Sequence, residues 1–476
     1  MSGAFGAGNR RIPRSAALTL VIPLLLTGCV HYSAHPLAPI QSEAAFQKRG
    51  LDDAGLAQFA RSPTTVAAAP WPPKALDLPS AVLIAIYFSP AQQVARAQLK
   101  IAEAGIIAAG GRLNPAISSS GGYENSPESP VVMRFEFSLP VETARKRSYR
   151  ILVAAKLADA SRIELKEAGW RVYSRVREAW NAHRLATEEA ELLQAESGIR
   201  LEAASLFEKR LAVGEISQPE WNSVQVEVNK IAVAQRAAEG RVAETLAQLS
   251  SAMAVPLDAL GRISLDLHDD PPQRLEDLPI ARLQNKGLLN RLDIQRTLLE
   301  YAAAEANLQL EVAKQYPDVQ LNPGYDFDEG HHKFTFGPAL PIPVWNRNRG
   351  GIAEAEAKRA EVEARFLALQ SQAISEMEHA LAQYKTALAE FQEADQKWSV
   401  VQAARERATI LAVSLGAEDR LALNAMQLEG LAVRSARLAA LAKTRAASSA
   451  LEEAVQAPLG DVSWPGFSPA AEAHNP

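Results

Sequence analysis

Residues 316–319 of the chain read Tyr-Pro-Asp-Val, and Gly-Tyr follows at 324–325. An earlier stretch has the same form, with Asn-Pro-Ala-Ile at 114–117 followed by Gly-Tyr at 122–123. Further pairs keep the same spacing of about 202 residues: the strand-like Phe135–Pro140 with Phe334–Pro341, and Gly214 with Gly416. A fixed spacing within one chain indicates a tandem duplication of one structural unit.

Each unit contains two short segments in which apolar and polar residues alternate, which is the pattern of strands with one apolar face. The clearest apolar face is that of Val131, Met133, Phe135, Phe137 and Leu139. In the second unit, Phe334 and Phe336 alternate with Lys333 and Thr335. We therefore expect four strands, each close to the 9–11 residues that cross a bilayer.

A very long proline-free run follows each pair of strands, over Val141–Gln218 and Ile352–Leu415. A helix of about 70 residues would be about 105 Å long, far longer than most helices. Apolar residues recur every seven positions in both runs, as in a coiled-coil seam, and we interpret them as helix packing and not as a cofactor site. They are Leu185, Leu192, Ile199, Leu206 and Val213, then Met377, Tyr384, Phe391 and Trp398.

Glycine ends both runs, and a second helix returns from each glycine. Gly214 and Gly416 are natural reversal points because glycine tolerates the left-handed conformation that ends many helices. Pro219 opens the first return helix, which we expect to reach about Ala254, and its counterpart should reach about Ala454.

Four strands with one apolar face do not form a stable sheet alone, and helices of this length do not form the core of a small domain. A membrane barrel with lipid outside and a polar lumen explains the alternation better than a soluble sandwich. Such a barrel must close, and single-chain barrels begin at about eight strands, so the chain must assemble by cyclic symmetry. The lipid-facing positions are then Phe135, Phe137, Phe334 and Phe336.

Composition excludes several classes of protein. The net charge of −5 without a clustered basic face argues against a nucleic-acid partner. The eight histidines are scattered, and neither a nucleophile elbow nor a phosphate-binding glycine loop is present. We therefore expect no enzyme, no catalytic residues and no cofactor.

The lone cysteine, Cys29, follows a segment that resembles a signal peptide. Basic residues at 10, 11 and 14 precede an apolar run over 16–26, which is too short to span a bilayer. The sequence Leu26-Thr27-Gly28-Cys29 also resembles a bacterial lipobox, in which Cys29 becomes the lipidated N-terminus. The alternative is an ordinary signal peptide with a chance cysteine.

These patterns divide the chain into five segments. Residues 1–28 are a lipoprotein signal peptide, 29–78 an extended N-terminal segment and 456–476 a C-terminal tail. The first repeat covers 79–280, with strands at about 115–140 and helices at about 141–254. The second repeat covers 281–455, with strands at about 317–343 and helices at about 350–454.

From about residue 78 to 455 the sequence resembles the TolC family of outer-membrane efflux channels. The motifs are Leu-Pro-Val-Glu-Thr-Ala-Arg-Lys-Arg at 139–147, Leu-Pro-Ile-Pro-Val-Trp-Asn-Arg-Asn-Arg-Gly at 340–350, Arg-Leu-Ala-Val-Gly-Glu at 210–215, and Leu415-Gly416. The first two are most similar to the CzcC-like branch, which serves heavy-metal resistance pumps. The resemblance implies a mainly α tandem-repeat fold with a small membrane β part.

The resemblance also implies a homotrimer with a 12-stranded β-barrel in the outer membrane of a Gram-negative bacterium. A long α-helical barrel extends into the periplasm, and the terminal segments form an equatorial belt. The resemblance thus implies a passive exit duct for a periplasmic adaptor and an inner-membrane RND-type pump, with heavy-metal cations as expected substrates. Alternatives are a duct of the same fold for drugs or type I protein secretion, and a trimeric coiled-coil structural lipoprotein or adhesin.

Carboxylates near the reversals are candidates for the periplasmic mouth. Glu220 matches an acidic position of the family, and three copies would form a ring that attracts cations. Alternatively, Glu220 stabilises the first turn of the helix that Pro219 opens. Glu418 and Asp419 lie near the second reversal and are alternatively helix caps, while Ala422 and Ala425 stand where the best-known family member has aspartates.

The loop between the last two strands carries Asp328, His331 and His332, a weak candidate metal set that is more often a solvated turn. Arg347 and Arg349 lie where the second strand pair passes into its helix. We expect them to form hydrogen bonds at the helix start and not to contact substrate.

Overall fold

The computed structural model describes residues 31–61, 71–123, 131–268, 272, 287–328 and 330–459. The chain divides into two compact units, Met1–Lys48 and Arg49–Pro476. The first unit contains helix α2 (Pro39–Gln47), and none of its residues is buried. Cys29, the signal segment and most of the tail lie outside the described residues.

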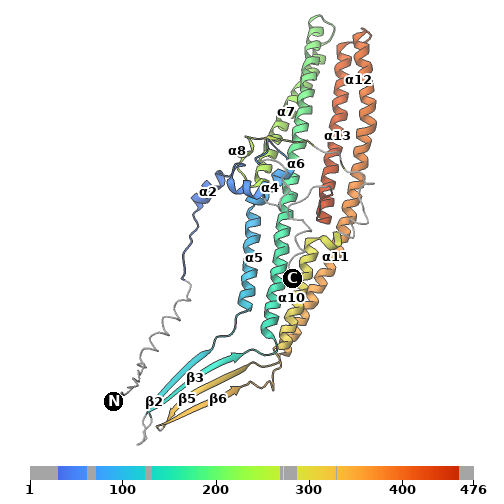
Figure 1. Cartoon of the computed structure of the whole chain (residues 1–476). Coiled ribbons are helices and arrows are strands. Elements are labelled where there is room, and N and C mark those ends of the chain that lie inside the picture. The colour runs from blue at the N-terminus through green and yellow to red at the C-terminus, as the bar shows by residue number, and fades with distance from the viewer. Residues whose placement is uncertain are drawn as a thin grey trace, which may run out of the picture. The chain divides into compact units, whose positions relative to one another are not determined.

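The second unit is built mainly from helices (Figure 1). Those of the first repeat are α4 (Leu78–Phe88), α5 (Pro90–Ala109), α6 (Lys146–Ala212) and α7 (Gln218–Met253). Those of the second repeat are α10 (Leu292–Ala313), α11 (Arg349–Gln392), α12 (Ser399–Ser414) and α13 (Arg420–Val455). The described residues also form two short helices, α3 (Ala54–Ala60) and α8 (Leu257–Leu260), and a parallel pair of strands, β1 (Ala75–Leu76) and β4 (Ser264–Leu265).

Four antiparallel strands form a sheet at one end of these helices (Figure 1). They are β2 (Ala116–Tyr123), β3 (Val131–Val141), β5 (Val319–Asp328) and β6 (His331–Ala339). The order β2-β3-β5-β6 places the hairpins of the two repeats side by side, through pairs such as Phe135 with Tyr325. Strands β2 and β6 are the two edges, so the sheet is open on both sides.

The two long helices begin in the same way. Arg145 before α6 and Asn348 before α11 both adopt the left-handed conformation, with φ of 60° and 57°. The junction is held by Asp318, which accepts hydrogen bonds from the Thr143 backbone N–H at 2.9 Å and from Lys146 Nζ at 2.7 Å. Burial opposes ionisation of Asp318, but these two donors outweigh it and lower the pKa of the carboxyl.

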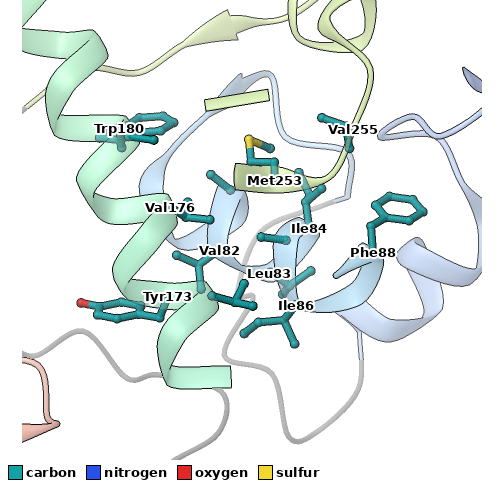
Figure 2. Packing of buried hydrophobic residues seen from close by; sticks show 14 of the residues in the cluster. Val82, Leu83, Ile84, Ile86, Phe88, Tyr173, Val176, Trp180, Met253 and Val255 are labelled. Atoms are coloured by element: carbon teal, nitrogen blue, oxygen red, sulfur yellow. The ribbon is translucent and has the colours of Figure 1, made fainter. Parts of the chain in front are cut away.

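The main core lies where α4 packs against α6 and the end of α7. Figure 2 shows Val82 and Ile84 of α4 in one cluster with Val176 of α6 and Met253 of α7, and all four side chains are buried. Helix α4 has no polar face: it is apolar on nearly every side, because neighbouring elements enclose it. A second cluster joins α11 to α13 through Met377, Tyr384 and Leu451.

One expected stripe is interrupted. Met377, Tyr384 and Phe391 are buried as the seven-residue pattern predicts, but Trp398 is 53% exposed. A π-helical segment, η2 (Glu393–Trp398), separates α11 from α12. Its wider turn inserts an extra residue, so the side chains that follow are rotated away from the seam. The proline-free run over 352–415 is therefore not one regular α-helix, because it contains this π-helical segment.

Within the described residues, no single helix is both long and apolar enough to cross a membrane, and only the bent pair α4–α5 meets the length and composition criteria together.

Candidate functional site

The two helix reversals have the same geometry. Gly214 and Gly416 have φ of +77° and +73°, a region where any other residue would be strained. After each glycine, one backbone N–H returns to a carbonyl of the helix just ended, from Glu215 to Arg210 at 2.9 Å and from Ala417 to Ala412 at 2.9 Å. These bonds satisfy helix-end carbonyls and stop both helices at equivalent positions.

Glu220 completes a capping box at the start of α7. Its Oε2 accepts hydrogen bonds from the Ser217 backbone N–H at 2.7 Å and from Ser217 Oγ at 2.9 Å. The Ser217 backbone donor is the main reason that the pKa of Glu220 is lowered. The carboxylate is exposed, and among the described residues no cation forms an ion pair with it. Glu220 therefore caps the helix and also presents a negative charge to solvent.

Asp419 has a different environment at the start of α13. One oxygen accepts the Ala422 backbone N–H at 2.8 Å, and the other lies 2.7 Å from Nη2 of Arg210. The Ala422 N–H and then the Arg210 guanidinium lower the pKa of the Asp419 carboxyl below its ordinary value of 3.8. Asp419 thus caps its helix and pairs with Arg210, and both Asp419 and Glu418 are exposed.

Two ion pairs join the reversal of the first repeat to that of the second. Besides Arg210 with Asp419, Nε of Arg420 lies 2.7 Å from a carboxylate oxygen of Glu202. Sequence reasoning quoted Arg210 only as part of a family motif, and it did not select Arg420 or Glu202. The only sequence signal for the Arg210 ion pair was its position as a basic residue in the last turn of α6. Basic residues are common at that position because they complement the helix dipole, so the signal was not specific.

We expect Asp419→Ala to accelerate amide hydrogen exchange at Ala422 and its neighbours at pH 7. Because the folded pKa is depressed, the cap stabilises α13 above the unfolded pKa and is lost as pH falls through the folded value. The difference in exchange between variant and wild type should therefore shrink below pH 3.8. Arg210→Gln is the matched control, since it removes the ion pair and keeps the cap. Equal exchange in Asp419→Ala and wild type at pH 7 would contradict the assigned cap.

The sheet has two chemically distinct faces. Phe135, Phe137, Phe334 and Phe336 are 48, 37, 84 and 73% exposed, as a face without a partner in this chain requires. On the other face, Arg134 Nε lies 2.7 Å from Asp326 and Lys333 Nζ lies 3.0 Å from Asp328. Because side chains alternate along each strand, the charged pairs and the phenylalanines lie on opposite sides.

The weak metal set at the β5–β6 turn does not assemble. Asp328 pairs with Lys333, and His332 Nδ1 lies 2.6 Å from the Tyr325 hydroxyl. His331 and His332 are consecutive in β6, so their side chains point to opposite faces. Among the described residues, no group of three or more His, Cys, Asp or Glu side chains is placed to hold a metal ion. Within the part of the chain that the structure describes, Asp328, His331 and His332 are therefore not gathered as a metal site would require.

Arg347 and Arg349 play a smaller part at the helix start than expected. Arg347 Nε donates only a long hydrogen bond, 3.4 Å, to the Pro343 carbonyl. The residue that ties this junction is Asn348, whose Nδ2 donates to the Glu311 carbonyl at 2.9 Å and to its carboxylate at 2.8 Å. The only sequence signal for this role was the residue type, since asparagine tolerates the left-handed backbone conformation that Asn348 adopts.

Solved structures with the same architecture identify the fold. The outer membrane protein VceC of Vibrio cholerae is 19% identical and superposes with a TM-score of 0.64 over 80% of this chain and 97% of its own. The MtrE outer membrane channel of Neisseria gonorrhoeae, in its open state, is 17% identical with a TM-score of 0.62 over 80% and 89%. This chain has the TolC-type fold.

One curated relative adds to this TolC-type assignment. The cobalt-zinc-cadmium resistance protein CzcC of Cupriavidus metallidurans is 26% identical over 262 residues, 54% of this chain. The match spans 60% of the length of that relative. No protein-family model matches the chain. The resemblance to the TolC family and to its CzcC-like branch, drawn from the sequence motifs, is confirmed by these similarities.

Proposed function

We propose that the protein is the outer-membrane channel of an efflux system and a passive exit duct for its substrates. The observation that carries this proposal is the open four-stranded sheet with exposed phenylalanines, joined to long helical hairpins in a TolC-type fold. Backbone groups at a sheet edge cannot stay unpaired in lipid, so β2 and β6 must pair with other copies. Three copies of four strands make a closed twelve-stranded barrel.

The proposed assembly is therefore a homotrimer in the outer membrane of a Gram-negative bacterium, with the helices in the periplasm. Its partners are a periplasmic adaptor and an inner-membrane RND-type pump. The return helices α7 and α13 argue against a simple coiled-coil stalk or adhesin, which needs no reversal at Gly214 or Gly416.

Heavy-metal cations are the proposed substrates. The support is the similarity to a relative whose name states cobalt-zinc-cadmium resistance. Drugs and type I secreted proteins are the alternative cargoes of the same duct.

Growth of a strain lacking the gene tests the proposed cargo. We expect loss of tolerance to Co²⁺, Zn²⁺ or Cd²⁺, restored by the wild-type gene and not by an assembly-defective variant. Unchanged tolerance to all three cations, with raised sensitivity to organic drugs or loss of a secreted protein, would replace metal efflux by one of the alternatives.

We also propose that Cys29 carries the lipid anchor. The support is the position of the lone cysteine within Leu26–Cys29, directly after a short apolar run. Labelled palmitate should enter the wild-type protein and not Cys29→Ser, and equal labelling of both would rule out Cys29. The barrel should still retain the variant in the membrane.

Glu220 is the proposed cation-attracting carboxylate of the periplasmic mouth. Three exposed copies near the axis would attract cations, and Glu220, unlike Asp419, has no cationic side chain paired with it among the described residues. We expect Glu220→Gln to lower cation preference in single-channel recordings at low salt. At 1 M salt the effect should shrink, because the Debye length is then only about 3 Å and the carboxylate charges are screened.

The capping box supplies the control for this experiment. Ser217→Ala removes a capping partner and keeps the Glu220 carboxylate, so cation preference should stay unchanged. If Glu220→Gln leaves the selectivity of an intact trimer unchanged at low salt, Glu220 serves only as a cap.

A further inference from the structure

A groove of about 570 Å³ lies beside the junction between the sheet and the helices of the second repeat. One wall is the end of α10 and the approach to β5, with Lys314, Gln315 and Pro317. The other wall is the segment from Pro341 to Asn346, which connects β6 to α11. Figure 1 shows β5 and β6 meeting α10 and α11 at this junction.

The groove lies just past the end of β6, which stops at Ala339. Phe334 and Phe336 lie on the apolar face of the sheet, and the segment beyond β6 adds the apolar residues Leu340, Ile342 and Val344. Ile342, Val344 and Trp345 are 77, 66 and 78% exposed, although each is strongly apolar. A run of exposed apolar side chains of this kind indicates an unseen binding partner.

The same segment is basic at its helical end. Residues 340–349 contain Arg347 and Arg349 and no acidic residue. Both arginines are exposed, and among the described residues neither forms an ion pair. Exposed aliphatic groups, then a tryptophan, then two guanidinium groups follow one another within ten residues. That order matches acyl chain, interface and phosphate in a lipid leaflet.

We propose that this groove binds a glycerophospholipid of the periplasmic leaflet. Its acyl chain lies along Ile342 and Val344, Trp345 lies at the level of the glycerol, and Arg347 and Arg349 contact the phosphate. This inference rests on the proposed function, since it requires that the apolar face of the sheet meets lipid. The bound lipid would fix how deeply the periplasmic rim of the barrel sits in the membrane.

Quenching of Trp345 fluorescence tests the apolar part of the site. The full-length trimer is reconstituted in vesicles of phosphatidylethanolamine and phosphatidylglycerol, with or without phospholipid brominated near the top of the acyl chain. The emission of Trp345 is the difference between wild type and Trp345→Phe, and we expect brominated lipid to quench roughly half of it or more, as for an interfacial tryptophan. Trp398→Phe is the control, because Trp398 is also exposed but lies in η2, and its emission should not be quenched.

The amount of phospholipid that the purified protein retains tests the contribution of Arg347 and Arg349. Phosphatidylglycerol bound per detergent-purified trimer is measured by native mass spectrometry for wild type and for Arg347→Gln with Arg349→Gln. We expect binding to weaken at least about 5-fold, because a basic residue near an anionic lipid surface contributes about 1 kcal/mol. Arg236→Gln is the matched control, since Arg236 is exposed on α7.

The outcomes separate this inference from the proposed function. A trimer that inserts into vesicles while Trp345 escapes brominated lipid overturns the lipid site and leaves the channel intact. Trp345 shielded from both brominated lipid and aqueous acrylamide would show that a second copy of the chain fills the groove, which also overturns the proposal. A chain that never inserts overturns the proposed function instead.

Discussion

Arg291→Met is expected to lower the stability of the helical part by about 3–5 kcal/mol, the usual effect of breaking a buried ion pair on one side. Arg291 is buried at the start of α10 and contacts three other positions. Its guanidinium binds Asp293 at 2.7 Å, Glu376 of α11 at 2.8 Å and the Ala454 carbonyl of α13 at 3.0 Å. Burial acts to lower the pKa of Arg291, but the two carboxylates outweigh it and raise it.

The measurement is the unfolding of the detergent-solubilised protein in urea, followed by the helical signal in circular dichroism. Arg291→Lys should lose less than Arg291→Met, since lysine keeps the charge and loses the forked geometry. Arg236→Gln removes an exposed pair with Glu239 and should cost less than about 1 kcal/mol. If Arg291→Met destabilised the protein no more than Arg236→Gln, Arg291 would not hold these three helices together.

Phe334→Arg is expected to abolish membrane insertion and the proposed trimer. Phe334 lies near the middle of β6 on the apolar face and is 84% exposed in the single chain. An arginine facing lipid near the bilayer centre costs about 2–4 kcal/mol, and the trimer contains three copies. We expect the variant to accumulate as monomer outside the outer-membrane fraction, measured by fractionation and native mass spectrometry.

Ser118→Arg is the matched control on the other face. Ser118 is the register partner of Glu136 in the β2–β3 hairpin, so the new guanidinium would lie opposite a carboxylate on the polar side of the sheet. That variant should assemble and change only conductance or ion selectivity. Normal trimers of Phe334→Arg in the outer membrane would refute the assignment of the phenylalanine face to lipid.

The sequence by itself determined the features that depend on neighbouring residues. Alternation predicted β3 and β6 with their exposed phenylalanines, since side-chain direction in a strand depends only on the parity of the position. Gly214 and Gly416 marked both reversals because positive φ is a local steric requirement. The absence of proline predicted α6 at nearly its full length.

Only the tertiary structure decided which distant side chains meet. Asp419 caps α13 through a local bond from Ala422, but its pairing with Arg210, from the other repeat, arises only in the folded chain. Trp398 left its predicted stripe because the π-helical segment before α12 changes the helical phase, which a seven-residue count cannot detect. Arg291 stood out neither by motif nor by periodicity. Its role arises from the packing of α10, α11 and α13, because a buried charge is stable only where folding brings its partners within hydrogen-bond distance.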